Sequence, residues 1–214
     1  FRAHALNPEH PHMRGSHENG DIFFQHREAC NKYYDELPAV VESYMDKINA
    51  KLGTDYKLFN YYGAPDADRV IIAMGSICDV AEEVIDYLNA HGEKVGLIKV
   101  RLYRPFAADR LISALPKTAK KVAVLDRTKE PGAQGEPLYL DVVTAFANAG
   151  LNDVKVIGGR YGLGSKDTPP ASVFAIYNEL KKDAPKHQFT IGIVDDVTGL
   201  SIEEDKNCPT TAAP

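Results

Sequence analysis

Short apolar runs alternate with segments of helical periodicity along this chain, and that alternation restricts it to few folds. Residues 70–74 are apolar and stop at Gly75-Ser76, after which apolar residues recur at helical spacing from Ile77 to Leu88. Such a pair predicts a buried strand followed by an amphipathic helix. Further apolar runs occupy 95–100, 122–125, 154–157 and 189–194, with helical segments between them. We therefore expect an α/β fold with an open, mostly parallel sheet of five to six strands and helices on both faces.

The pattern divides the chain into three segments. Residues 1–55 are predicted to be an extended entry arm and a connecting helix, residues 56–195 the α/β domain, and residues 196–214 an exit linker. Residues 1–25 are polar, rich in Pro, Gly and His, and show no period, which is typical of a looping arm. Apolar positions from Leu37 to Leu52 predict a helix that ends at Gly53, and Pro38 is expected to kink it or to begin a second helix. The polar tail after residue 195 is expected to be a linker or disordered.

Charge and cysteine content exclude several function classes. The net charge of −5 is spread without long runs, and no apolar stretch approaches membrane-spanning length. Both facts argue against a nucleic-acid surface and against a membrane protein. The three cysteines, Cys30, Cys78 and Cys208, lie far apart, so we expect neither a disulfide framework nor a self-contained zinc or iron–sulfur site. These features favour a reducing, cytoplasmic setting, and a start without Met suggests an excised segment of a longer protein.

The loops that follow the strands are where a ligand is expected, because open parallel sheets bind ligands beyond the carboxyl ends of their strands. These loops start at Gly75, Arg101, Asp126 and Gly158. At the first, Ser76 is expected to cap the following helix, and this interpretation is favoured over anion binding by the same turn.

Basic side chains distinguish the other three loops. Arg101 and Arg104 are spaced to clamp a carboxylate or phosphate, although ion pairing with nearby acids is the favoured explanation. Arg127 and Lys129 belong to a charged loop that is either a contact loop or simply solvated. The glycine-rich stretch 158–166 departs from a phosphate loop because Ser165 precedes Lys166. It is therefore predicted to be an interdomain loop, whose Arg160 and Lys166 could meet an anion.

Catalytic machinery is not recognisable in the sequence. No Ser-His-Asp or Cys-His arrangement is apparent. His10-Pro11-His12 could hold a metal, but no further ligand at a suitable spacing completes a site, so a flexible polar arm is favoured. The paired acids Asp195-Asp196 are interpreted as part of a solvated exit. We expect no catalytic residue and no metal ligand in this chain.

Taken together, the motifs closely resemble those of the pyruvate:ferredoxin (flavodoxin) oxidoreductase family, in family order and over nearly the whole chain. They are Asn7-Pro8-Glu9-His10-Pro11, Phe23-Phe24-Gln25-His26-Arg27-Glu28, Gly63-Ala64-Pro65, Met74-Gly75-Ser76, Leu102-Tyr103-Arg104-Pro105-Phe106, 125–132, 158–163, 165–168, 189–193 and Asp195-Asp196. The resemblance implies the family's second domain, which is similar to the C-terminal domain of transketolase.

For the full-length enzyme, the resemblance implies oxidative decarboxylation of pyruvate to acetyl-CoA. Thiamine diphosphate, Mg and iron–sulfur clusters would be its cofactors, ferredoxin or flavodoxin its electron acceptor, and a homodimer its expected assembly. This chain lacks a Gly-Asp-Gly diphosphate-binding motif and a ferredoxin-type cysteine run, so no cofactor is expected within it. What the resemblance implies here is a non-catalytic module that packs on the other domains and shapes access to the active site. The candidate contact residues are Gly75, Ser76, Arg101, Arg104, Arg127, Lys129, Arg160 and Lys166.

Two other interpretations remain open. The chain could be an autonomous α/β domain that binds coenzyme A or a nucleotide through the Gly75 turn or the Gly158 loop. It could also be a pure interaction module, which should expose an apolar patch where a partner sits.

Overall fold

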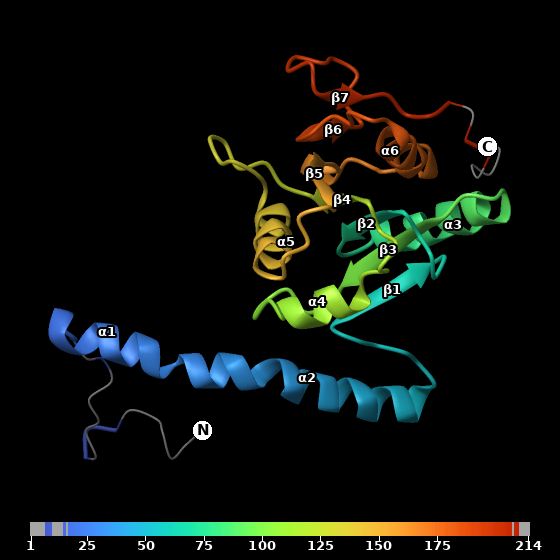
Figure 1. Cartoon of the computed structure of the whole chain (residues 1–214). Helices are drawn as coiled ribbons and strands as arrows, with labels where there is room; N and C mark the ends of the chain where they lie inside the picture. Colours follow the sequence, from blue (N-terminus) through green and yellow to red (C-terminus); the bar gives the residue numbers. More distant parts are fainter. Residues whose placement is uncertain (1–6, 10–14, 16, 207, 210–214) are drawn as a thin grey trace.

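The apolar runs of the sequence become the strands of a single sheet in the computed structural model, which describes residues 7–9, 15, 17–206 and 208–209 (Figure 1). Its strands are β1 (Phe59–Gly63), β2 (Arg69–Ala73), β3 (Val95–Val100), β4 (Lys121–Asp126), β5 (Lys155–Arg160), β6 (Phe189–Ile191) and β7 (Ser201–Ile202). β2 is buried at every position, and β3 and β4 at all but one. Burial on both faces explains why these segments read as continuous apolar runs rather than as alternating patterns.

The sheet has the order β1-β3-β2-β4-β5-β6-β7, with only β1 antiparallel to its neighbour. One face is covered by α3 (Ile77–Ala90) and α6 (Pro170–Lys181), whose buried side chains form one core cluster. The other face is covered by α4 (Ala108–Ala114) and α5 (Pro137–Asn148), which contribute to a second cluster. The predicted α/β class, with a mostly parallel sheet and helices on both faces, is confirmed. The strand count of five to six is wrong, because β7 adds a seventh.

The entry segment is more helical than its composition predicts. α1 (Gly20–Ala29) begins inside the stretch expected to be a looping arm, and α2 (Asn31–Leu52) runs through Pro38 without a break. The two helices meet at Cys30, so the expectation that a second helix would begin at Pro38 is wrong. α2 ends as predicted at Gly53, whose φ of +70° is the left-handed geometry that glycine adopts most readily. His10-Pro11-His12 lies outside the described residues.

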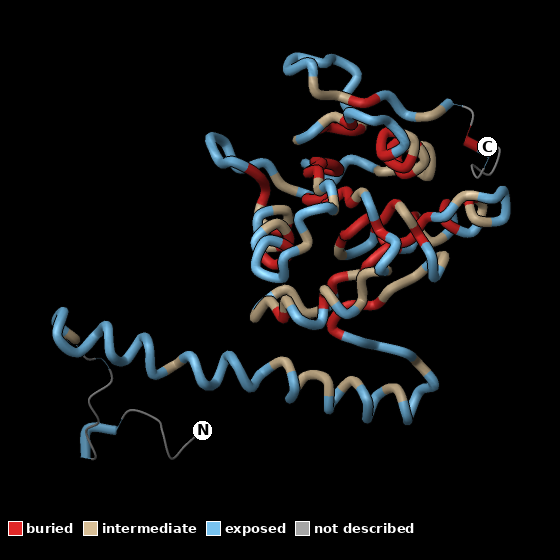
Figure 2. The backbone as a smooth tube through the Cα atoms, in the orientation of Figure 1, coloured by how far each residue is buried: buried red, intermediate tan, exposed pale blue. Residues whose placement is uncertain are grey.

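α1 and α2 contain no buried residue and lie along the outside of the domain (Figure 2). α2 contacts the rest of the fold through Val41 and Met45, which pack against the second core cluster. The Arg110 guanidinium, on α4, also forms a two-pronged ion pair with the Glu42 carboxylate, at 2.9 and 3.0 Å. α2 is therefore anchored along its middle, while α1 extends beyond the domain (Figure 1). No helix of the described residues is both long and apolar enough to span a membrane.

The segment after residue 195 continues the sheet. Ser201 and Ile202 pair with Thr190 and Ile191 of β6, and Ile202 is buried. The linker expectation is therefore wrong for these two residues, because the exposed edge of β6 is a better partner for their backbone groups than water. The division into three segments as such stays a prediction.

The glycine-rich stretch also begins inside a strand, since Gly158, Gly159 and Arg160 belong to β5. Gly159 lies directly opposite Phe189 of β6, and a Cβ atom placed there would overlap the Phe189 ring. The loop predicted to start at Gly158 starts instead after Arg160, and Leu163–Ser165 forms a short 3₁₀ turn.

Candidate functional site

The carboxyl ends of β2 and β4 mark the point where the chain changes direction across the sheet. From β2 it passes through α3 to β3 on one side, and from β4 it passes through α5 to β5 on the other. Loops that diverge from two neighbouring parallel strands leave a crevice between them, which is the usual ligand position in doubly wound sheets. The loops that begin at Gly75 and Arg127 flank this crevice.

The turn after β2 depends on glycine and not on a serine cap. Gly75 has a φ of +80°, a conformation that side chains rarely adopt. Ser76 has helical angles (φ −64°, ψ −23°), and its side chain caps no backbone group. A capping residue needs an extended backbone to turn its oxygen toward the helix amides. The predicted capping role of Ser76 is therefore wrong.

A cavity of about 260 Å³ occupies the crevice. Ser76 lines it from the start of α3, Arg127 from the loop after β4, and Tyr161 and Lys166 from the loop after β5. The Arg127 Nε donates a hydrogen bond of 2.8 Å to the Gly162 carbonyl, so the loops after β4 and β5 are joined. Burial raises the pKa of Tyr161 to about 12, which keeps its phenol protonated at neutral pH. With Thr168 and Asp167, which also line it, this cavity offers two cations, three hydroxyl groups and one carboxylate.

A second hollow of about 240 Å³ lies beside the first, beyond the ends of β5 and β6. Its basic lining residues are Lys129, Arg160 and Lys166, and Lys166 and Tyr161 also line the first cavity. Much of the remaining wall is apolar, including Leu163, Ile191, Ile193 and Val197. Gly75 adjoins Ser76 in the chain, so six of the eight candidate residues gather at one edge of the sheet.

Arg160 is held mainly by the protein itself. Its Nη1 lies 3.2 Å from the Glu136 carboxylate, its Nη2 donates to the Gln188 carbonyl at 2.6 Å, and the side chain is only 7% exposed. Glu136 also accepts a hydrogen bond from the Glu130 amide at 2.7 Å, and the Lys129 Nζ lies 3.8 Å away. Glu136 was not among the residues predicted from the sequence, although its position before a proline at the start of α5 was a signal.

Asp126 is a second buried carboxylate that the sequence analysis did not single out. Its two oxygens accept hydrogen bonds from the Leu138 and Tyr139 amides, at 2.9 and 3.1 Å, in the first turn of α5. Burial raises the pKa of Asp126, while these two backbone bonds oppose the shift. The residue joins the end of β4 to the helix that follows, so its role is structural.

Arg101 and Arg104 do not converge on a common point. Arg101 Nε donates to the Asn60 side chain at 2.8 Å, and its guanidinium lies over the Tyr56 ring. Arg104 lies 2.8 Å from the Asp141 carboxylate. The favoured explanation, ion pairing with a nearby acid, is therefore confirmed for Arg104, whereas Arg101 forms no ion pair within the described part of the chain. Contact of either arginine with a ligand stays a prediction.

Comparison with known proteins identifies the protein family of this chain. The model of a family described as "Pyruvate:ferredoxin oxidoreductase core domain II" matches residues 67–173. This chain belongs to that family. The matched range contains all eight candidate residues but not α1, α2, β1, β6 or β7.

Relatives of this core domain II extend the similarity to the whole chain. A "Pyruvate:ferredoxin oxidoreductase" of Moorella thermoacetica is 54% identical over 211 residues, which cover 99% of the chain and 18% of that protein. A "Pyruvate-flavodoxin oxidoreductase" of Enterobacter agglomerans is 53% identical over 214 residues, which cover 100% and 18%. The chain thus spans less than a fifth of the length of these curated relatives. A solved 2-oxoglutarate:ferredoxin oxidoreductase from Magnetococcus marinus is 23% identical with a TM-score of 0.42, covering 63% of this chain and 21% of that one. That similarity is too low to support an inference.

The donor groups of the described part of this core domain II do not fit a metal or an iron–sulfur cluster. Within it, no three His, Cys, Asp or Glu side chains gather in an arrangement that could hold a metal ion. A cluster needs thiolate ligands, yet burial raises the pKa of Cys78 to about 11, so its thiol stays protonated. Cys30, on the outer helices, donates its thiol to the His26 carbonyl at 3.4 Å. The chemistry that the candidate site does offer is the binding of an anionic or polar group.

Proposed function

We propose that this chain is core domain II of a pyruvate-oxidising enzyme, in which it has a structural role and shapes access to the active site. One observation carries the proposal. Relatives named for the oxidation of pyruvate match the chain from end to end at 53–54% identity, yet the chain spans only 18% of their length. A segment of this kind is a domain within a much longer polypeptide.

On this proposal, the reaction takes place on other domains of the same polypeptide. Those domains would hold thiamine diphosphate, Mg and the iron–sulfur clusters, and would act on pyruvate and coenzyme A with ferredoxin or flavodoxin as electron acceptor. The parent enzyme would be a cytoplasmic homodimer with no nucleic-acid or membrane partner. The contribution of this chain is a rigid sheet whose carboxyl edge presents Arg127, Lys129 and Lys166 toward the neighbouring domains.

The exposed surface of α1 and α2 supports the proposal that this chain is one domain of a larger protein. α1 and α2 expose ten large apolar side chains, with Phe24 at 71% and Tyr33 at 65% exposure. These ten are Ile22, Phe23, Phe24, Tyr33, Tyr34, Leu37, Val40, Tyr44, Ile48 and Leu52. Exposed apolar surface on this scale is unfavourable in an isolated domain and marks an interface. Because most of the polypeptide in the relatives lies outside this chain, we assign the surface to other domains of the parent protein.

The test compares the chain with its parent polypeptide. Purified separately, both are assayed for pyruvate-dependent, coenzyme A-dependent reduction of a viologen dye. The parent is expected to turn over and this chain is not. Within the parent, Phe24→Ser with Tyr33→Ser should lower the yield of assembled enzyme, whereas Lys57→Ser, an exposed control, should not. Turnover by the isolated chain would overturn the proposal.

The two hollows at the carboxyl edge favour one alternative, an autonomous domain that binds coenzyme A or a nucleotide. Lys166 lines both hollows, beside the cations Arg127 and Lys129. Calorimetric titration of the chain with coenzyme A, ATP and pyruvate separates the two functions. Tight binding by the isolated chain that is lost in Lys166→Ala, but kept in Lys57→Ala, would favour the alternative. No saturable binding would leave the domain role as the function.

A further inference from the structure

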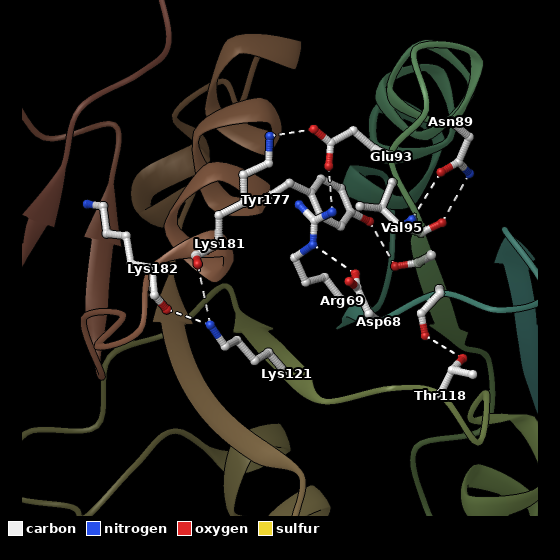
Figure 3. Close-up of polar contacts among 12 residues, drawn as sticks. Asp68, Arg69, Asn89, Glu93, Val95, Thr118, Lys121, Tyr177, Lys181 and Lys182 are labelled. Atoms are coloured by element: carbon white, nitrogen blue, oxygen red, sulfur yellow. Dashed lines mark hydrogen bonds and ion pairs between the residues drawn. The ribbon is translucent and has the colours of Figure 1, made fainter.

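The opposite edge of the sheet carries a polar cluster that the proposed function does not use. β2 and β4 begin side by side there, with Arg69 paired to Lys121 in register. The Asp68 carbonyl accepts hydrogen bonds from the amides of Lys120 and Lys121, at 2.9 and 3.1 Å, which fixes where β4 starts. A cavity of about 450 Å³ lies between these strand starts and the last turn of α6. Figure 3 shows the polar contacts among Arg69, Glu93 and Lys181, which line it. Its walls include Glu93, Leu180 and Lys181.

Arg69 is the buried cation at the base of this cluster. It is only 9% exposed, its Nε bonds the Asp68 carboxylate at 2.9 Å, and its Nη2 bonds the Glu93 carboxylate at 2.5 Å. Its remaining nitrogen, Nη1, is enclosed and has no hydrogen-bond partner among the residues that the structure describes. In Figure 3 this nitrogen is turned toward α6, on the same side as Lys181. A buried charged donor without an acceptor is costly, so an acceptor that entered here would be stabilising.

The charges around the cavity are unbalanced. Four cationic side chains and two carboxylates line it, which leaves two positive charges in excess, although the chain as a whole carries −5. Glu93 is already bound by Lys181 at 2.6 Å as well as by Arg69. Burial disfavours the charge on Glu93, but these two bonds outweigh burial and lower its pKa. The carboxylate is therefore ionised, and each of its oxygens already has a cationic partner. Lys121 donates to the Lys182 carbonyl at 2.6 Å.

Lys120 is the cation available to bind a ligand, because its ammonium group forms no hydrogen bond or ion pair with any described residue. We propose that this cavity binds the phosphate group of a small molecule, held by Lys120, Lys181 and the unpartnered nitrogen of Arg69. A phosphate carries between one and two negative charges at neutral pH and several acceptor oxygens. It therefore matches both the excess charge and the open donors, whereas a carboxylate would neutralise only half of that charge.

The test is calorimetric titration of the full 214-residue chain with inorganic phosphate and, separately, with pyrophosphate, at constant ionic strength. We expect saturable binding of at least one of them. Binding of both indicates a site for any phosphate group, and binding of pyrophosphate alone indicates a site for a larger phosphorylated molecule. Lys120→Glu should weaken binding roughly tenfold through loss of one charge-assisted contact and addition of a like charge.

Two control variants separate a specific site from general attraction. Lys57→Glu makes the same charge change at an exposed lysine outside the cavity, whose partner is Asp55, and should leave binding unchanged. Loss of binding in Lys166→Ala but not in Lys120→Glu would place the bound ion at the carboxyl edge and overturn this proposal, so failure of the proposed function and failure of this site are distinguishable. Absence of saturable binding of either ion, or equal weakening by Lys120→Glu and Lys57→Glu, would overturn the proposal.

Discussion

Replacing Gly159 with alanine should destabilise the fold much more than the same change at the adjacent Gly158. A Cβ atom at position 159 would lie 2.5 and 2.7 Å from two ring carbons of Phe189, and closer still to a third. Ordinary carbon contacts are about 3.5–4 Å, so the ring would have to move by about 1 Å. Phe189 is completely buried, and its surroundings are close-packed. The glycine is therefore required by packing and not by an unusual backbone angle.

The magnitude follows from two opposing terms. Overpacking a close-packed core costs about 1–3 kcal/mol, and we take the upper end because the overlap involves three ring atoms. Alanine in place of glycine in a strand recovers about 0.5–1 kcal/mol. The net loss at Gly159 is then about 2 kcal/mol. At Gly158 the nearest atom is 3.2 Å away on the partly exposed Tyr139 ring, so the two terms should nearly cancel.

Urea unfolding followed by far-UV circular dichroism suits this chain, because it contains no tryptophan. The decisive measurement adds Phe189→Leu, which removes the ring edge that a Cβ atom would meet. The double variant should be more stable than the sum of the two single losses predicts, by about 1 kcal/mol, because the residues are in direct contact. Equal losses at Gly158 and Gly159, or strict additivity with Phe189→Leu, would refute the reasoning.

Three further outcomes are expected. Glu136→Gln should cost about 3 kcal/mol in urea unfolding, because it leaves the buried Arg160 without its charged partner; a loss below about 1 kcal/mol, typical of exposed pairs, would contradict this. Tyr177→Phe should cost about 1–2 kcal/mol in the same assay, since its buried hydroxyl donates to the Gly96 carbonyl at 2.8 Å; an unchanged midpoint would contradict it. Iodoacetamide at pH 8 should label Cys30 before Cys78, whose pKa burial raises to about 11, and peptide mass spectrometry that found equal labelling would contradict the assigned burial.

The sequence was most informative where burial is most complete. The strands β2, β3 and β4 and the helix α3 were predictable because a segment buried on one or both faces must keep a regular apolar pattern. α1 was missed because it buries nothing, so no apolar period distinguishes it from a polar arm. β7 was missed because two residues carry no period at all, and only the free edge of β6 reveals where they pair.

The candidate site shows a similar limit. Sequence spacing placed these loops at the carboxyl edge of the sheet, where the structure also has them, but it could not tell a side chain that faces a cavity from one that holds the fold together. Asp126 and Glu136 are buried because they bind amides and a guanidinium that arrive from other elements. Such partners become neighbours only after folding, so the local sequence around each carboxylate does not predict them.

Whether a side chain faces a cavity or holds the fold together also decides which variants can test function at the carboxyl edge. Arg160 lines the apolar hollow, yet its bonds to Glu136 and to the Gln188 carbonyl tie β5 to α5 and to the start of β6. Its replacement would therefore impair folding and ligand contact together, and a loss of activity would have two explanations. Lys166 lines both hollows and its ammonium group bonds no described residue, so its truncation changes the charge that a ligand meets while the packing around it stays intact. An effect of Lys166→Ala on binding or turnover, at unchanged stability, is thus direct evidence for contact at this edge.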